Sequence, residues 1–145
     1  FIYAALLWPA MQAEQAFLEQ KKKMSPLQAQ NQAAHKVIGD QLAHTAIPKR
    51  FTSVIREIWD LQLRLPRRNG SRAERLLEHP RFRAAYDFVL LREEVGENMD
   101  GLGLWWTQYQ DADEHGRELL QQQLSNTAGN KPKRRRRKPK KPSEQ

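Results

Sequence analysis

The sequence predicts an all-α fold, an irregular helical array of about six or seven helices with a disordered basic C-terminal tail. Proline and glycine residues divide the chain into segments, and within each segment the apolar residues recur at the three- and four-residue spacing of a helix. No segment sustains the period-two alternation of a strand. With 39% hydrophobic residues and four tryptophans in 145 positions, the chain can bury the core of one compact unit.

The first helix is predicted over residues 2–23, with a bend near Pro9. Its broad apolar side consists of Leu6, Leu7, Ala10, Met11, Ala13, Phe17 and Leu18. Ser25 followed by Pro26 is a typical helix start, because the hydroxyl caps a free N–H group and proline suits the first helical position. This second helix is expected to reach about His44. Its inward residues are predicted to be Leu27, Ala34, Val37, Ile38 and Leu42.

The remaining helices are predicted between the later breakers. Pro66 ends a helix over about 48–65, with Phe51, Ile55, Ile58, Trp59 and Leu63 on its apolar side. After the turn "RRNGS", we expect a short helix over about 71–78 and a longer one over about 80–95. The longer helix turns inward Phe82, Ala85, Tyr86, Val89 and Leu90. One helix holds "LWWTQYQ", and the last is predicted over about 112–124.

Two regions of the chain are expected to behave differently. Residues 1–125 form the predicted folded body, and residues 126–145 the predicted disordered tail. The tail is rich in asparagine, glycine, proline and charge, which cannot bury enough apolar surface to fold. The chain opens on Phe1 inside an apolar helical pattern and without methionine, so we expect a piece cut from a longer protein.

The net charge of +8 comes from the tail, because residues 131–145 hold nine basic side chains and one acidic side chain. The rest of the chain sums to zero, but its charges are unevenly placed. Residues 48–83 carry ten basic and four acidic groups, whereas residues 84–130 carry two basic and nine acidic groups. This asymmetry indicates an anionic partner for the basic stretch.

Two further features bound the functional class. The absence of cysteine excludes disulfides, thiolate metal sites and a thiol nucleophile, and it agrees with the reducing cytoplasm. The longest apolar run ends at Pro9 and is far shorter than the roughly 20 residues that span a bilayer. We therefore expect a cytoplasmic protein without membrane insertion.

The basic stretch contains the candidate phosphate contacts Lys49, Arg50, Arg56, Arg64, Arg67, Arg68, Arg72, Arg75, Arg81 and Arg83. Arginine holds phosphate with two parallel hydrogen bonds, and aromatic residues lie between these cations. The alternative is a solvated face in which the cations pair with Asp60, Glu74, Glu78 or the acidic 84–130 half. Binding is favoured because "RLPRRNGSRAER" is a turn with few nearby acids, where three helix ends should converge.

The tail contributes a second set of candidate contacts, Lys133, Arg134, Arg135, Arg136, Arg137 and Lys138. A run of lysine and arginine broken by proline suits nucleic acid, but it also suits a nuclear-targeting signal or a membrane surface. The tail has no aromatic residue to stack on bases. It is therefore expected to raise affinity without reading sequence.

Catalytic and metal-binding patterns are weak. "DAD" at 111–113 resembles a metal-binding Asp-x-Asp pair, but it lies at a predicted helix start, where acidic residues complement the dipole. The four histidines fall on different segments without ligand spacing. Trp105 and Trp106 can stack on bases, although adjacent tryptophans more often place one ring in the core and one at its rim.

The stretch 47–92 resembles the C-terminal part of the bacterial poly(A) polymerase I family. The resemblance rests on "REIWDLQLRLPRR" and "LLEHPRFRAAYDF", and "YAALLWPAM", the following "WW" and the arginine-rich end complete the order. It implies membership of the nucleotidyltransferase superfamily shared with bacterial tRNA CCA-adding enzymes. Such an enzyme uses ATP and Mg²⁺ to add adenylates to RNA 3′ ends, which marks RNA for decay.

The resemblance also implies what this chain lacks. The family's metal-binding head lies N-terminal to the matching region, so no catalytic residue is carried over and no cofactor is expected in this chain. The expected partner is RNA, mainly single-stranded 3′ ends. The competing interpretation is a helical scaffold that docks RNA-decay proteins on its acidic half, and a freestanding enzyme is the weakest one.

Overall fold

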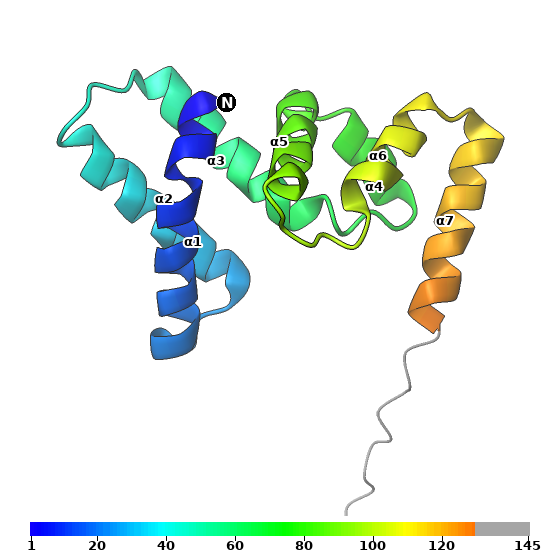
Figure 1. Ribbon diagram of the computed structural model, residues 1–145, viewed down its shortest axis with the longest axis horizontal. Coiled ribbons are helices and arrows are strands. Elements are labelled where there is room, and N and C mark those ends of the chain that lie inside the picture. The colour runs from blue at the N-terminus through cyan, green and yellow to red at the C-terminus, as the bar shows by residue number, and fades with distance from the viewer. Residues whose placement is uncertain (130–145) are drawn as a thin grey trace, which may run out of the picture.

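The computed structural model describes residues 1–129, which form seven α-helices and no strand (Figure 1). The helices are α1 (Ile2–Lys22), α2 (Pro26–Leu42), α3 (Lys49–Arg64), α4 (Ser71–Leu77), α5 (Phe82–Glu94), α6 (Leu102–Asp111) and α7 (Glu114–Gly129). The prediction of an all-α array is confirmed. None of these helices combines the length and the apolar character that crossing a membrane would need.

Helices α1 and α2 form an antiparallel pair at one end of the molecule (Figure 1). Ser25 caps α2 as predicted, since its hydroxyl accepts a hydrogen bond from the Gln28 N–H at 3.4 Å. Small residues line the contact between the two helices, and Ala4, Ala29 and Ala33 are fully buried. Alanine at these positions allows the helices to approach closely.

Helix α3 runs from this pair into the rest of the molecule and belongs to both hydrophobic clusters (Figure 1). Its middle joins α1 and α2 through Ile55, Ile58 and Trp59, and the Trp59 indole N–H donates to the Ala4 carbonyl at 3.0 Å. Its end, with Leu61, packs in the second cluster with α4, α5 and α6. The C-terminal part of α3 is thereby held against the helices that follow it.

A network of polar side chains joins the two clusters. The Arg92 guanidinium lies over the Trp8 ring at 4.6 Å and forms an ion pair with Glu97 at 2.8 Å. Its remaining nitrogen donates to Gln62 Oε1 at 3.1 Å. Gln62 is itself buried and donates to the Ala85 carbonyl at 3.1 Å. Because every one of these polar groups has a partner, the network fixes α5 against α1 and α3.

The structure differs from two predictions about the helices. Six large side chains expected inside are exposed, namely Leu6, Phe17, Leu27, Leu42, Phe51 and Leu90. The neighbouring helices cover a narrower stripe than the apolar side that the spacing outlines.

Helix α7 extends to Gly129, beyond the predicted boundary at 125, and the Ser125 hydroxyl donates back to the Gln121 carbonyl at 3.2 Å. Residues 130–145, including most of the predicted tail, lie outside the described residues.

Candidate nucleic-acid interface

The ten cations predicted in the body lie on α3, the following turn, α4 and the start of α5. Eight of them are exposed, and Arg68 and Arg81 are partly buried. They do not form one patch. Lys49 and Arg50 begin α3, whereas Arg64 ends it, which separates the two groups by roughly 22 Å along a helix that rises 1.5 Å per residue. At least two groups of the predicted cations are therefore separate, and Arg56 lies between them on α3.

Four of the predicted arginines meet at the C-terminal end of α3. Arg64 from α3, Arg67 from the turn, and Arg72 and Arg75 from α4 line a pocket of about 300 Å³. The only other residue that lines it is Leu76, which is buried in the second hydrophobic cluster. We call this hollow the arginine pocket. Its lining is therefore cationic with an apolar base.

The acids near the arginine pocket leave most of its charge uncompensated. Arg64 pairs with Asp60 at 3.4 Å, and both side chains are largely exposed. Within residues 1–129, Arg67, Arg72 and Arg75 form no ion pair. Three guanidinium groups therefore face the same hollow without an acidic partner.

Glu74 lies beside these arginines in sequence but is occupied elsewhere. It accepts hydrogen bonds from Nη1 of Arg117 at 3.2 and 3.3 Å and from the hydroxyl of Tyr109. Arg117 also lies over the Tyr109 ring at 4.8 Å and donates to the Tyr109 carbonyl at 3.1 Å. Burial, followed by the hydrogen bond and charge of Glu74, raises the pKa of Tyr109 to about 12. Glu74 thus helps to bind α4 to α6 and α7.

Arg68 has a different environment from its neighbours. Its guanidinium lies over the Trp105 ring at 4.8 Å, and Nη1 donates to the Pro66 carbonyl at 3.1 Å. Burial lowers the pKa of Arg68, and its Nε has no hydrogen-bond partner within residues 1–129. This side chain is directed to the second hydrophobic cluster and does not line the arginine pocket. Its place in the sequence gave no sign of that difference.

The turn between α3 and α4 is fastened to α7 by a residue that sequence reasoning missed. The Gln121 side chain accepts a hydrogen bond from the Gly70 N–H at 2.9 Å and donates to the Arg68 carbonyl at 2.8 Å. Gly70 has a positive φ of 59°, which glycine adopts without strain because it has no Cβ. The end of α3 and the start of α4 meet at this turn, but the third element is the middle of α7 and not a helix end as predicted, and Gln121 of α7 holds the turn in place.

Four of the five remaining predicted cations have local partners, and Lys49 is exposed and forms no ion pair within residues 1–129. Arg81 pairs with Glu57 at 3.1 Å, and Arg83 pairs with Asp87 at 3.2 Å. Nη2 of Arg56 lies 3.3 Å from Nδ1 of His35. Arg50 lies over the ring of Phe51 at 4.8 Å. These four are less available to an anion than the arginine pocket is.

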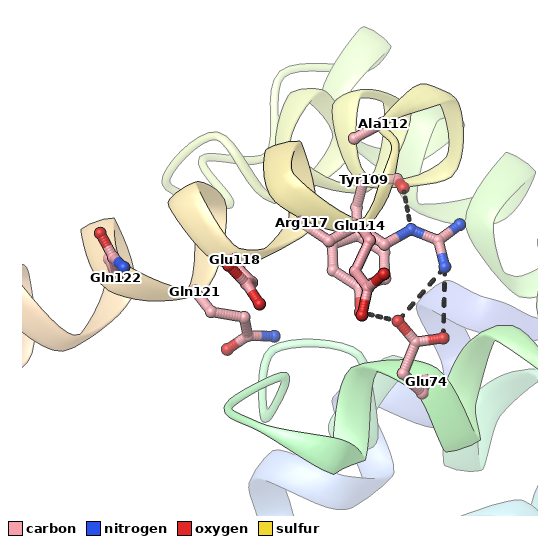
Figure 2. A pocket seen from close by; sticks show the side chains of 8 residues that line it. All are labelled: Glu74, Tyr109, Ala112, Glu114, Arg117, Glu118, Gln121 and Gln122. Atoms are coloured by element: carbon pink, nitrogen blue, oxygen red, sulfur yellow. Dashed lines mark hydrogen bonds and ion pairs between the residues drawn. The ribbon is translucent and has the colours of Figure 1, made fainter.

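The acidic part of the chain contains a larger and shallower hollow of about 960 Å³ between α4, α6 and α7. Figure 2 shows Glu74 and Arg117 facing each other on one side, with Glu118 and Gln121 directed from α7 toward the same space. Glu114 and Glu118 add two carboxylates that form no ion pair within residues 1–129. We call this hollow the acidic pocket; its charge is opposite to that expected for a phosphate site.

The weak catalytic patterns have structural roles. Asp113 accepts a hydrogen bond from the Gly116 N–H at 2.8 Å, which caps the start of α7. Trp106 is fully buried and donates to the Leu65 carbonyl at 3.2 Å, and Trp105 is 8% exposed. The core interpretation of this pair is therefore confirmed. Within residues 1–129, no cluster of three or more histidine or acidic side chains could hold a metal ion.

Residues 22–141 match the family described as "Polymerase A arginine-rich C-terminus". The chain is 42% identical over 113 residues to Poly(A) polymerase I of Escherichia coli O6:H1, and the match covers 76% of this chain and 24% of that protein. It is 36% identical over 125 residues to Poly(A) polymerase I of Haemophilus influenzae, and this match covers 85% of this chain and 27% of that protein. The chain therefore spans about a quarter of the length of these relatives.

Proposed function

We propose, from the premise that this chain belongs to the polymerase A arginine-rich C-terminus family, that it binds RNA as part of a bacterial poly(A) polymerase. It holds mainly single-stranded 3′ ends while a catalytic region outside this chain adds adenylates from ATP with Mg²⁺. We assign no catalytic residue and no cofactor to the chain itself. We also expect it to act in the cytoplasm beside proteins of RNA decay.

The observation that carries this proposal is the exposed, unpaired positive charge at the turn after α3. Arg67, Arg72 and Arg75 lie on the surface without an acidic partner within residues 1–129. A group of like charges repels itself, and binding of a polyanion relieves that repulsion. RNA supplies phosphates at regular intervals, and each neutralised phosphate releases counterions. The charge distribution therefore supports an RNA-binding role more directly than any other chemistry of the described residues.

Equilibrium binding of the full chain to labelled single-stranded RNA at several salt concentrations tests the proposal. The logarithm of the binding constant should fall linearly with that of salt, with a slope of about −0.7 for each phosphate contacted. A neutral peptide-nucleic-acid oligomer of the same bases is the matched control and should not bind measurably. Equal binding of both oligomers, or binding of neither, would overturn the RNA-binding role.

A second candidate is a scaffold that docks a protein partner with basic side chains. It is favoured by the acidic pocket, where Glu114 and Glu118 have no cationic partner within residues 1–129. The two candidate functions predict different effects on RNA binding when the exposed arginines of the body are removed. If RNA binding depends on the tail alone and is unaffected by removing the exposed arginines of the body, the scaffold becomes the better supported function.

A further inference from the structure

We propose that the arginine pocket is a shaped binding site for one phosphate group of RNA, held by guanidinium hydrogen bonds. The inference rests on the proposed RNA-binding function and deepens it, because general electrostatic attraction requires no pocket. One phosphate is thereby placed at the turn after α3 and is held there by guanidinium N–H groups. The predicted contacts at the other end of α3 are not included in this site.

Arginines from three different elements converge on the arginine pocket. Arg64, Arg67 and Arg72 come from a helix end, a turn and the next helix, yet they line the same hollow. Arginine presents planar, paired donors that match two oxygens of a phosphate, and several such forks can surround one tetrahedral group. The volume of about 300 Å³ lies at the lower end of small-ligand sites. It suits one phosphate with part of its sugar.

The positive charge of the arginine pocket exceeds the negative charge around it. Four arginines line the pocket, and among residues 1–129 only Asp60 pairs with one of them. The acid closest in sequence, Glu74, is withdrawn by Arg117 and Tyr109. A phosphate group therefore finds donors that do not first have to give up an ion pair. Arg81 and Arg83, in contrast, would have to break their ion pairs before binding a phosphate, which costs free energy.

The arginine pocket is held in shape before any ligand binds. Leu76 anchors α4 in the second hydrophobic cluster, and Gln121 fastens the turn at Gly70. Arg68, packed over Trp105, fixes the turn from the other side. A preorganised site loses less conformational entropy on binding than a mobile loop does. The backbone that carries these arginines is therefore ready for a ligand of defined shape.

The decisive variant is Arg67→Ala with Arg72→Ala, assayed in the full chain. The matched control is Lys21→Ala with Lys22→Ala, which removes the same charge from exposed side chains at the distant end of α1. We expect the pocket variant to bind single-stranded RNA at least about tenfold more weakly, and the control to change much less. Melting temperatures of both variants should remain near that of the parent chain, which shows that the comparison concerns folded proteins.

A third variant, Arg67→Lys with Arg72→Lys, separates shape from charge. Lysine keeps the positive charge but cannot form the two-pronged contact. We expect it to recover only part of the affinity that the alanine variant lacks. Full recovery, or a pocket variant no weaker than the control, would overturn the shaped site while leaving the RNA-binding function in place. Absence of RNA binding by the parent chain would instead overturn the proposed function.

The source of the phosphate is resolved with two RNA oligomers of one sequence, one carrying a 5′-phosphate and one a 5′-hydroxyl. An equal loss of affinity for both in the pocket variant assigns the site to a backbone phosphate, and a loss confined to the first assigns it to a terminal phosphate. ATP is the third ligand. If the pocket variant loses affinity for ATP but keeps that for both oligomers, the assignment to RNA is wrong.

Discussion

Glu74 of α4 pairs with Arg117 of α7, which lies 43 positions away in the chain, and not with the arginine next to it. This pairing affects the charge on the surface around the turn. A carboxylate that would compensate Arg72 or Arg75 is used to join two helices, so the positive charge at the turn stays exposed. Glu74 of the basic half and Arg117 of the acidic half thus neutralise each other, while Arg72 and Arg75 form no ion pair within residues 1–129.

Arg68→Ala should destabilise the fold by about 1–2 kcal/mol, since it removes a cation–π interaction and the packing of the side-chain stem over Trp105. Arg67→Ala is the matched control, because Arg67 is exposed, and it should change stability by less than about 0.5 kcal/mol. Urea denaturation of both variants measures the difference. Equal stabilities would show that the packing over Trp105 contributes nothing.

Gln121→Glu should loosen the turn after α3. The substitution keeps an acceptor for the Gly70 N–H but removes the donor that bonds the Arg68 carbonyl. We expect the free energy of unfolding to fall by about 1–3 kcal/mol and RNA binding to weaken, because a carboxylate then faces a carbonyl. Gln122→Glu adds the same charge to an exposed residue of α7 and serves as the control. If both variants lose RNA affinity equally, the effect comes from charge and not from the turn.

Tyr109 should make stability depend on pH in the alkaline range. Its pKa is raised from the ordinary 10.0 to about 12 in the folded chain, so the folded state favours the protonated phenol. The contribution is fully present below pH 10 and is lost as the pH rises toward about 12. The stability advantage of the parent chain over Tyr109→Phe should shrink across this range in denaturation experiments. Tyr3→Phe, at an exposed position, should follow the parent chain.

Removal of residues 131–145 should weaken the binding of RNA to a similar extent whatever the base sequence of the RNA. These residues supply nine cations and no base-stacking side chain. For single-stranded RNA, the salt dependence should become shallower by about 0.7 for each phosphate that the shortened chain no longer neutralises. Oligomers of different sequence and equal length make the comparison. An unchanged slope would mean that the tail does not touch RNA.

The isolated chain should not add AMP to an RNA oligomer. Phosphoryl transfer by two metal ions requires a carboxylate pair, and Asp113 of the only Asp-x-Asp sequence caps α7. Incubation with ATP, Mg²⁺ and RNA, followed by gel analysis, is the test. An extended product that depends on this chain would sink the prediction.

The helices could be predicted from the sequence because their limits are local. Pro26, Pro66 and Gly101 mark ends that the structure reproduces within a few residues. Which side of each helix is buried depends on its neighbours, which spacing alone does not reveal. Leu6 therefore remains at 70% exposure while the polar Gln30 is buried, where it donates to the Trp59 carbonyl at 2.7 Å. A glutamine gives no apolar signal, although its amide can satisfy a buried carbonyl.

The candidate site was predictable in composition and not in arrangement. The density of arginine around Pro66 and Gly70 indicated binding, and four of those side chains do line one pocket. Arg67 and Arg68 are adjacent and identical in type, yet only the first lines the pocket. Their difference arises from Trp105, which lies in another helix. Pairings across such distances in the chain, like that of Gln121 with Gly70, follow from tertiary packing alone.

On the proposal that the arginine pocket and the basic tail both bind RNA, the link between Gln121 and the turn also determines how the two regions act together. Gln121 lies eight residues before Gly129, so the end of α7 is roughly 12 Å along the helix from the point where Gln121 holds the arginine-bearing turn. An RNA strand held at one of these places is presented to the other at a high effective concentration. The combined affinity then exceeds what either region gives, with no additional interaction. Inserting whole helical turns into α7 should therefore lower this effective concentration and weaken RNA binding without removing any contact.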